Sequence, residues 1–176
     1  MKKILTEWRN FINESTQESQ PQKFPEKVYY GIPISQLDKV RDTGMVHMPT
    51  PQDVQGNKMG VPTCHSHADA FEYGEVVLEV CGKHLNESGE YVCSPNSKGS
   101  RISMTDSSYM SGSGIDSMVD SLGTKIPFSA VTSLIFNKKP NVEKLKTSGY
   151  GNLGISMMNP ESPDDLEALY TPEEEP

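Results

Sequence analysis

Apolar positions in this chain follow helical spacing first and short strand-like runs afterwards. Within residues 1–14, five apolar side chains recur at helical spacing between charged and polar ones, which predicts an amphipathic helix. Residues 15–26 are polar and contain two prolines, which predicts a linker. The helix either packs on the domain that follows or serves as a detachable docking segment, and both interpretations stay open.

The pattern changes at residue 27. "KVYYGIP" (27–33) is typical of a short strand. Apolar residues at helical spacing in 34–44 predict a helix, and Gly44 stands where a helix C-cap is expected. Residues 45–59 are expected to form a loop.

Residues 60–81 predict a strand, a short helix and a second strand. "GVPTC" is typical of a strand, and Pro62 would confine that strand to a sheet edge because proline lacks a backbone N–H. "SHADAFEYG" predicts a short helix with Ser66 as its N-cap and Gly74 as its end. "EVVLEVCG" is expected to be a buried strand.

The remaining chain gives weaker patterns. Residues 86–114 are rich in Ser, Gly and Asn, and 107–114 are predicted to be mobile, whereas 126–136 should carry a core strand. Residues 152–176 are predicted to be an acidic C-terminal tail. Short strands that alternate with short helices predict a small α+β domain with a mixed β-sheet over residues 27–151.

Charge is concentrated at the C-terminal end of the chain. The formal net charge is −8, and residues 161–176 hold seven acidic residues and no Lys or Arg. The rest of the chain is therefore close to neutral, which gives no strong nucleic-acid signature. No apolar run approaches the ~20 residues that a membrane helix needs, so no membrane partner is predicted.

Two Cys-x-x-His pairs raise the alternative of a zinc-stabilised binding module. Cys64 and His67 form the first pair, and Cys81 and His84 form the second. Paired spacing of soft and borderline ligands is how structural zinc is commonly held. The competing interpretation is that the cysteines are small buried residues and the histidines lie on the surface, so that no metal is bound.

Three blocks in order resemble ADP-ribosyltransferase-like domains, the superfamily of poly-ADP-ribose polymerases, bacterial toxins and RNA 2′-phosphotransferases. The first is "VYYGIPISQLDKVRDTGM", which resembles the family's opening strand and helix. The second is Gly60-Val61, followed by Ala70, Tyr73-Gly74 and "EVVLEV". The third is an acidic residue ahead of a strand that begins Ile-Pro, as in "GIDSMVDSLGTKIPFSAV".

The resemblance implies a fold, a cofactor and a site. NAD would be the substrate that donates ADP-ribose, with the backbone of Gly31 pairing with its carboxamide and Tyr30 contacting the adenosine ribose. Tyr73 would stack on the nicotinamide ring. Asp116 or Asp120 would hold the nicotinamide ribose and stabilise developing positive charge. Tyr30 stands where the family usually has His, and the two aspartates stand where it has Glu.

A second resemblance concerns the N-terminal segment. "MKKILTEWRNFINES" looks like the head-targeting segments of proteins packaged in tailed-phage capsids, and Ile12-Asn13-Glu14 matches the cleavage motif of the phage head protease. It implies a phage protein that acts in the host cytoplasm or is packaged in the phage head, with capsid components among its partners. The acceptor would be a macromolecule, expected to be a protein. A non-catalytic virion or internal head protein on the same fold is the alternative.

Overall fold

Two β-sheets and several short helices form the part of the chain that the structure describes. The computed structural model describes residues 22–47, 52, 60–95, 97–104 and 124–172. One sheet contains eight strands in the order β10-β9-β8-β4-β1-β3-β6-β5, and the other pairs β2 with β7. The strands of the large sheet are β1 (Lys27–Ile32), β3 (Val61–Cys64), β4 (Val76–Cys81), β5 (Tyr91–Pro95), β6 (Gly99–Met104), β8 (Val131–Phe136), β9 (Gly154–Met158) and β10 (Leu166–Tyr170). Those of the small sheet are β2 (Met45–His47) and β7 (Thr124–Ile126).

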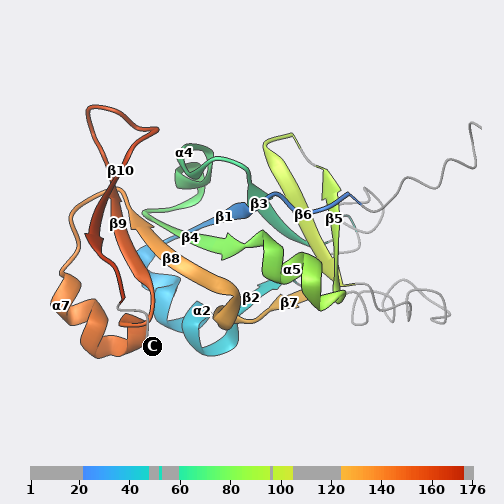
Figure 1. Ribbon diagram of the computed structural model, residues 1–176, viewed down its shortest axis with the longest axis horizontal. Helices are drawn as coiled ribbons and strands as arrows, with labels where there is room; N and C mark the ends of the chain where they lie inside the picture. The colour runs from blue at the N-terminus through green and yellow to red at the C-terminus, as the bar shows by residue number, and fades with distance from the viewer. Residues whose placement is uncertain (1–21, 48–51, 53–59, 96, 105–123, 173–176) are drawn as a thin grey trace, which may run out of the picture.

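The large sheet is mostly antiparallel, with one parallel pair formed by β8 and β9. Figure 1 shows β9 and β10 at one end of the sheet and β6 and β5 at the other. The helical segments are η1 (Ile34–Gln36), α2 (Leu37–Thr43), α4 (His67–Ala70), η2 (Phe71–Tyr73), α5 (Gly82–Ser88), η4 (Phe128–Ala130), α7 (Val142–Leu145) and η5 (Lys146–Tyr150). This architecture confirms the prediction of a mixed α and β domain at that coarse level.

Both faces of the central strand β4 are covered, which explains its nearly continuous apolar sequence. On one face, Val76, Leu78 and Val80 belong to the main core cluster, which also includes Leu37 of α2 and Leu85 of α5. On the other face, Val77, Ile135 and Ala70 of α4 form a smaller cluster. In Figure 1, α4 and α2 accordingly lie on opposite sides of β1 and β4.

The predicted strand, helix and strand over residues 60–81 are confirmed. The Ser66 side chain accepts a hydrogen bond from the Ala68 N–H at 3.1 Å and caps α4. The continuation of α4, η2, ends at Gly74. The helix predicted in 34–44 is also present, and Gly44 follows it with a φ of 79°, a conformation that favours glycine.

Two predictions for the strands near the small sheet are wrong. Residues 45–47 are not loop, because Met45–His47 pairs with β7 and Met45 is fully buried. Pro62 is not on an edge strand, since β3 lies between β1 and β6. β1 is registered with β3 only at Tyr29 and Cys64, so the side of β3 that faces β1 has no paired partner at Pro62 and resembles a sheet edge there.

The Ser-, Gly- and Asn-rich region also contains regular structure. β5 and β6 form an antiparallel hairpin, and β6 extends the sheet from β3. Ile102 is fully buried, and Cys93 is nearly so. Their alternation with polar residues is short and was hidden by the composition of the region.

The predicted tail and linker are wrong where the structure describes them. β9 runs parallel to β8 with Ile155 fully buried, and β10 pairs with β9, so residues 154–170 complete the sheet. At the other end, Phe24 is buried, and its backbone exchanges two hydrogen bonds with the Asn86 side chain. Residues 22–26 therefore belong to the fold. The predicted helix in 1–14, linker residues 15–21 and the predicted mobile segment 107–114 lie outside the described residues.

Candidate functional site

A gap in the large sheet creates a pocket between β1 and β3. β1 is in register with β4 over six residue pairs, from Lys27 with Cys81 to Ile32 with Val76. On its other side, the register joins β1 to β3 through the single pair of Tyr29 and Cys64. Beyond that pair the two strands part, and a pocket of about 350 Å³ lies along the gap.

Backbone, aromatic rings, small polar groups and two cations line this pocket. The lining residues are Tyr29, Tyr30, Gly31, Pro62, Thr63, Cys64, Tyr73, Ser97, Lys98 and Arg101. They come from β1, β3, β6, η2 and the turn that precedes β6. The volume lies at the lower end of the range of about 300–1,000 Å³ that is usual for small-molecule sites.

The absence of a side chain at Gly31 positions one wall of the pocket. α4 crosses β1 so closely that a Cβ atom on Gly31 would lie 1.8 Å from the Ala70 carbonyl oxygen and 3.2 Å from the Tyr73 Cβ. The glycine therefore lets α4 and η2 pack directly on the strand, which carries the Tyr73 ring to the pocket. Tyr73 remains 57% exposed, so its side chain is accessible to a ligand.

The two tyrosines of β1 remain neutral at physiological pH. Burial raises the pKa of the Tyr30 hydroxyl above its usual value. Burial also raises the pKa of Tyr29, and the Glu79 carboxylate adds to this effect. The Tyr29 ring meets the His67 ring edge-on at a centroid distance of 5.8 Å. Both hydroxyls are therefore neutral hydrogen-bonding groups and not bases, and the Tyr30 side chain also packs against the main core.

The thiol of Cys64, a residue of the pocket lining, is protonated at neutral pH. Its side chain is nearly buried, and this burial raises the pKa of the thiol, with a further contribution from the negative charge of Asp69. A thiol with a raised pKa is a poor nucleophile at neutral pH because the thiolate is the reactive form. The arrangement does not favour covalent catalysis by Cys64.

The cations give the pocket an anion-binding side. Lys98 forms an ion pair with Glu72 of η2, and this carboxylate raises the pKa of the Lys98 ammonium. The Arg101 guanidinium donates a hydrogen bond to the Gly60 carbonyl at 3.3 Å. Aromatic faces beside two cations suit a ligand that combines a planar ring with phosphate or carboxylate groups.

The structure brings three of the five residues assigned by the resemblance to one place. Tyr30, Gly31 and Tyr73 all line the pocket. Asp116 and Asp120 lie outside the described residues. Lys98 and Arg101 were missed, because they fall in the Ser- and Gly-rich region where no strand was predicted. A basic residue at each end of the short run "KGSR" was the available signal.

The four residues of the zinc alternative do not form a ligand cluster. Cys64 pairs with Tyr29 in the sheet, whereas Cys81 pairs with Lys27, and the His67 ring contacts the Pro163 carbonyl at 2.8 Å. In the part of the chain that the structure describes, no group of three or more His, Cys, Asp or Glu residues could hold a metal ion.

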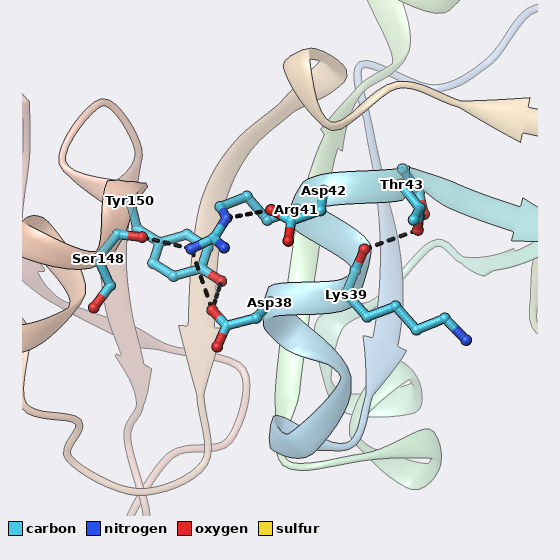
Figure 2. Close-up of polar contacts among 8 residues, drawn as sticks. Asp38, Lys39, Arg41, Asp42, Thr43, Ser148 and Tyr150 are labelled. Carbon is cyan, nitrogen blue, oxygen red and sulfur yellow. Dashed lines mark hydrogen bonds and ion pairs between the residues drawn. The ribbon is translucent and has the colours of Figure 1, made fainter.

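A second polar cluster joins α2 to η5 (Figure 2). The Tyr150 hydroxyl donates to Asp38 Oδ1 at 2.7 Å, and Arg41 Nη1 donates to the Ser148 carbonyl at 2.6 Å. The Arg41 guanidinium also lies over the Tyr150 ring, 5.3 Å from its centroid. These contacts join two segments that are distant in sequence, so we assign the cluster a structural role.

Comparison of the chain with protein-family models, curated proteins and solved structures gave no match. Across the described residues, no helix is long and apolar enough to cross a membrane.

Proposed function

We propose that this protein transfers ADP-ribose from NAD to a macromolecular acceptor, and that NAD binds in the pocket between β1 and β3. The observation that carries the proposal is the meeting of Tyr30, Gly31 and Tyr73 in one pocket. These residues belong to two separate blocks of the resemblance, and they were selected from the sequence as the NAD-binding set. Their convergence supports the proposal, because unrelated residues of two blocks have no reason to line the same cavity.

The lining residues fit the chemical parts of NAD. The exposed Tyr73 side chain is suited to stack on the nicotinamide ring, and Gly31 lines the gap where β3 has parted from β1. The neutral hydroxyl of Tyr30 is suited to hydrogen-bond a ribose hydroxyl. This assignment puts the nicotinamide ring near η2 and the rest of NAD along the gap between β1 and β3.

In the proposed reaction, the bond between nicotinamide and ribose C1′ breaks and nicotinamide leaves with the bonding electrons. An acceptor nucleophile then bonds to C1′ and gives up its proton. The ribose carries positive charge in the transition state, which a nearby carboxylate stabilises more strongly than it stabilises bound NAD. We assign this role to Asp116, with Asp120 as the second candidate.

The test is calorimetric titration of NAD into the protein, combined with an assay for released nicotinamide. We expect NAD to bind and to be cleaved slowly without an acceptor, with water as the nucleophile. Asp116→Ala should abolish cleavage while most of the binding remains, because the carboxylate acts on charge that develops only during the reaction. Asp120→Ala should reduce cleavage less than Asp116→Ala does, and the reverse order would assign the carboxylate role to Asp120. Absence of NAD binding at millimolar concentration would refute the proposal.

A further inference from the structure

The ion pair between Lys98 and Glu72 links the two sides of the pocket. Lys98 precedes β6, and Glu72 lies on η2 directly before Tyr73. Lys98 lines the pocket together with Arg101 and Tyr73. The Glu72 carboxylate thus pairs with a pocket cation, and it precedes the Tyr73 ring of the pocket in the chain.

This ion pair is easily exchanged. The Lys98 side chain is 39% exposed and the Glu72 side chain is 57% exposed. Ion pairs with this exposure contribute little to stability, because both partners are well hydrated when they separate. A ligand with a stronger anion can therefore replace Glu72 at small cost.

Arg101 is held more firmly than Lys98. Its side chain is half-buried on β6, which is paired on both sides, and one of its N–H groups donates to the Gly60 carbonyl. A guanidinium has five N–H donors in a planar fork that matches the oxygens of a phosphate group. Arg101 is thus suited to fix the orientation of an anion that Lys98 helps to neutralise.

We propose that Lys98 and Arg101 form a diphosphate subsite. Glu72 stays paired with Lys98 until a ligand diphosphate displaces it. This inference rests on the proposed function for the rest of the ligand, because NAD carries its diphosphate between two ribosyl groups. The ligand class that fits the subsite is a nucleoside diphosphate or a dinucleotide. Glu72 acts against binding, so removal of its charge strengthens binding of the diphosphate.

The experiment measures the affinities of ADP, NAD and nicotinamide riboside by calorimetry. The variants are Arg101→Gln, Lys98→Gln and Glu72→Gln. The control is Lys83→Gln, which removes a more exposed lysine from the Lys83–Glu87 ion pair of α5, outside the pocket. Thermal melts of each variant verify folding, and Arg101→Lys provides a charge-retaining replacement if Arg101→Gln does not fold.

We expect Arg101→Gln and Lys98→Gln to bind ADP about 10-fold or more weakly, which corresponds to the loss of a charge-assisted hydrogen bond. Glu72→Gln should bind ADP up to about 5-fold more tightly, in keeping with a weak competing ion pair. Nicotinamide riboside, which has no phosphate, should bind all three variants as it binds the wild type. Lys83→Gln should match the wild type with every ligand.

The subsite is refuted if wild-type protein does not bind ADP at millimolar concentration, or if the pocket variants bind it normally. It is also refuted if Glu72→Gln weakens ADP binding, since a purely structural ion pair would give that sign. The proposed function can fail separately: ADP would bind with the expected dependences while NAD is not cleaved. If NAD is cleaved but its KM is unchanged in Arg101→Gln and Lys98→Gln, the subsite alone is wrong.

Discussion

The Ala70 carbonyl oxygen lies over Gly31 at a point where a Cβ atom would approach it to 1.8 Å. The obstacle is backbone of α4, which cannot rotate away as a side chain could. This relationship joins β1 to α4 and thereby places the Tyr73 ring at the pocket. It makes Gly31 a structural requirement of the site, whatever ligand the site binds.

Gly31→Ala should therefore destabilise the protein strongly. We expect the free energy of unfolding to fall by about 3 kcal/mol, the upper part of the usual range for overpacking, because strand and helix must move apart. Urea unfolding followed by circular dichroism measures this loss. Gly151→Ala is the matched control: its Cβ would come no closer than 3.4 Å to any atom, and its φ is −68°. It should leave stability unchanged or raise it by up to about 1 kcal/mol. If the two variants change the free energy of unfolding equally, β1 and α4 can accommodate a side chain at Gly31, and the prediction is wrong.

Local signals in the sequence were sufficient to predict the helices and strands around the pocket. The Ser66 cap and the Gly74 stop define α4 and η2 within a few residues, and the apolar run of β4 identifies a strand covered on both faces. These features depend on neighbouring residues, so they can be read along the chain. Gly31 and Tyr73, by contrast, were predicted as site residues only through the resemblance of their two blocks to a known family.

The elements that the sequence did not predict depend on distant partners. β2 has three residues and gains its ladder from β7, which follows it by more than 70 residues in the chain. β10 has three exposed positions out of five and forms because β9 offers an edge. The cations Lys98 and Arg101 reach the pocket only because β6 pairs with β3. Composition gives no information on such pairings.

Residues 161–172 should contribute to stability despite their acidic composition. Leu169 and Tyr170 pack against the main core, and the Tyr170 hydroxyl donates to the Gly151 carbonyl at 2.9 Å. Deletion of residues 161–176 should therefore lower the free energy of unfolding by about 2 kcal/mol, since two half-buried large side chains together bury about as much apolar surface as one fully buried side chain, which contributes about 1.5–3 kcal/mol. Denaturant unfolding of the truncated protein measures the loss.

Two point variants separate packing from chain length in this segment. Tyr170→Ala should reproduce much of the loss, whereas Glu167→Ala, at an exposed position of the same strand, should stay within about 0.5 kcal/mol of wild type. A truncated protein as stable as the full chain would mean that β10 adds nothing to the sheet.

Tyr150→Phe should lower stability by about 1 kcal/mol at neutral pH. The variant loses the hydrogen bond to Asp38, but the Asp38 side chain is 75% exposed and is hydrated once the bond is gone. Urea unfolding of the variant and wild type at one pH gives this difference. Tyr91→Phe, which loses an exposed bond to the Lys125 carbonyl, is the matched control and should change stability less.

The difference between Tyr150→Phe and wild type should shrink at high pH. Burial raises the pKa of Tyr150 above its ordinary value of 10.0, and the bond to Asp38 raises it further. Above pH ~10 the unfolded chain loses the Tyr150 proton while the folded protein keeps it, so this tyrosine's contribution to stability declines as pH rises. The Phe variant lacks that decline. A constant difference from pH 7 to pH 11 would show that Tyr150 ionises normally in the folded state.

Tyr73→Ala should weaken NAD binding without weakening the fold. Stacking of a base on an aromatic side chain contributes about 1–3 kcal/mol, so we expect the Kd for NAD to rise about 5-fold to 150-fold. The ring is more than half exposed, and its removal should change stability by less than about 0.5 kcal/mol. Val46→Ala, an exposed apolar truncation on β2, is the control for both measurements. Unchanged NAD affinity in Tyr73→Ala would remove the stacking role.

Cys64 offers a measure of pocket occupancy, because it belongs to the pocket lining whereas Cys81 and Cys93 do not. Burial and the charge of Asp69 raise the pKa of the Cys64 thiol, so its thiolate fraction at pH 8 is lower than that of an ordinary cysteine. Alkylation by iodoacetamide at pH 8, followed by peptide mass spectrometry, should therefore be slow at Cys64 and should accelerate as pH rises.

Saturating NAD should slow alkylation of Cys64 further and leave the rate at Cys81 unchanged. Cys81 is the internal control because it ends β4 away from the pocket lining. Nicotinamide alone should protect less than NAD if the ligand extends along the gap between β1 and β3. Protection of both cysteines would indicate a general tightening of the fold, and protection of neither would place NAD outside this pocket. The measurement needs no catalysis, so it locates the ligand even in an Asp116→Ala protein that no longer cleaves NAD.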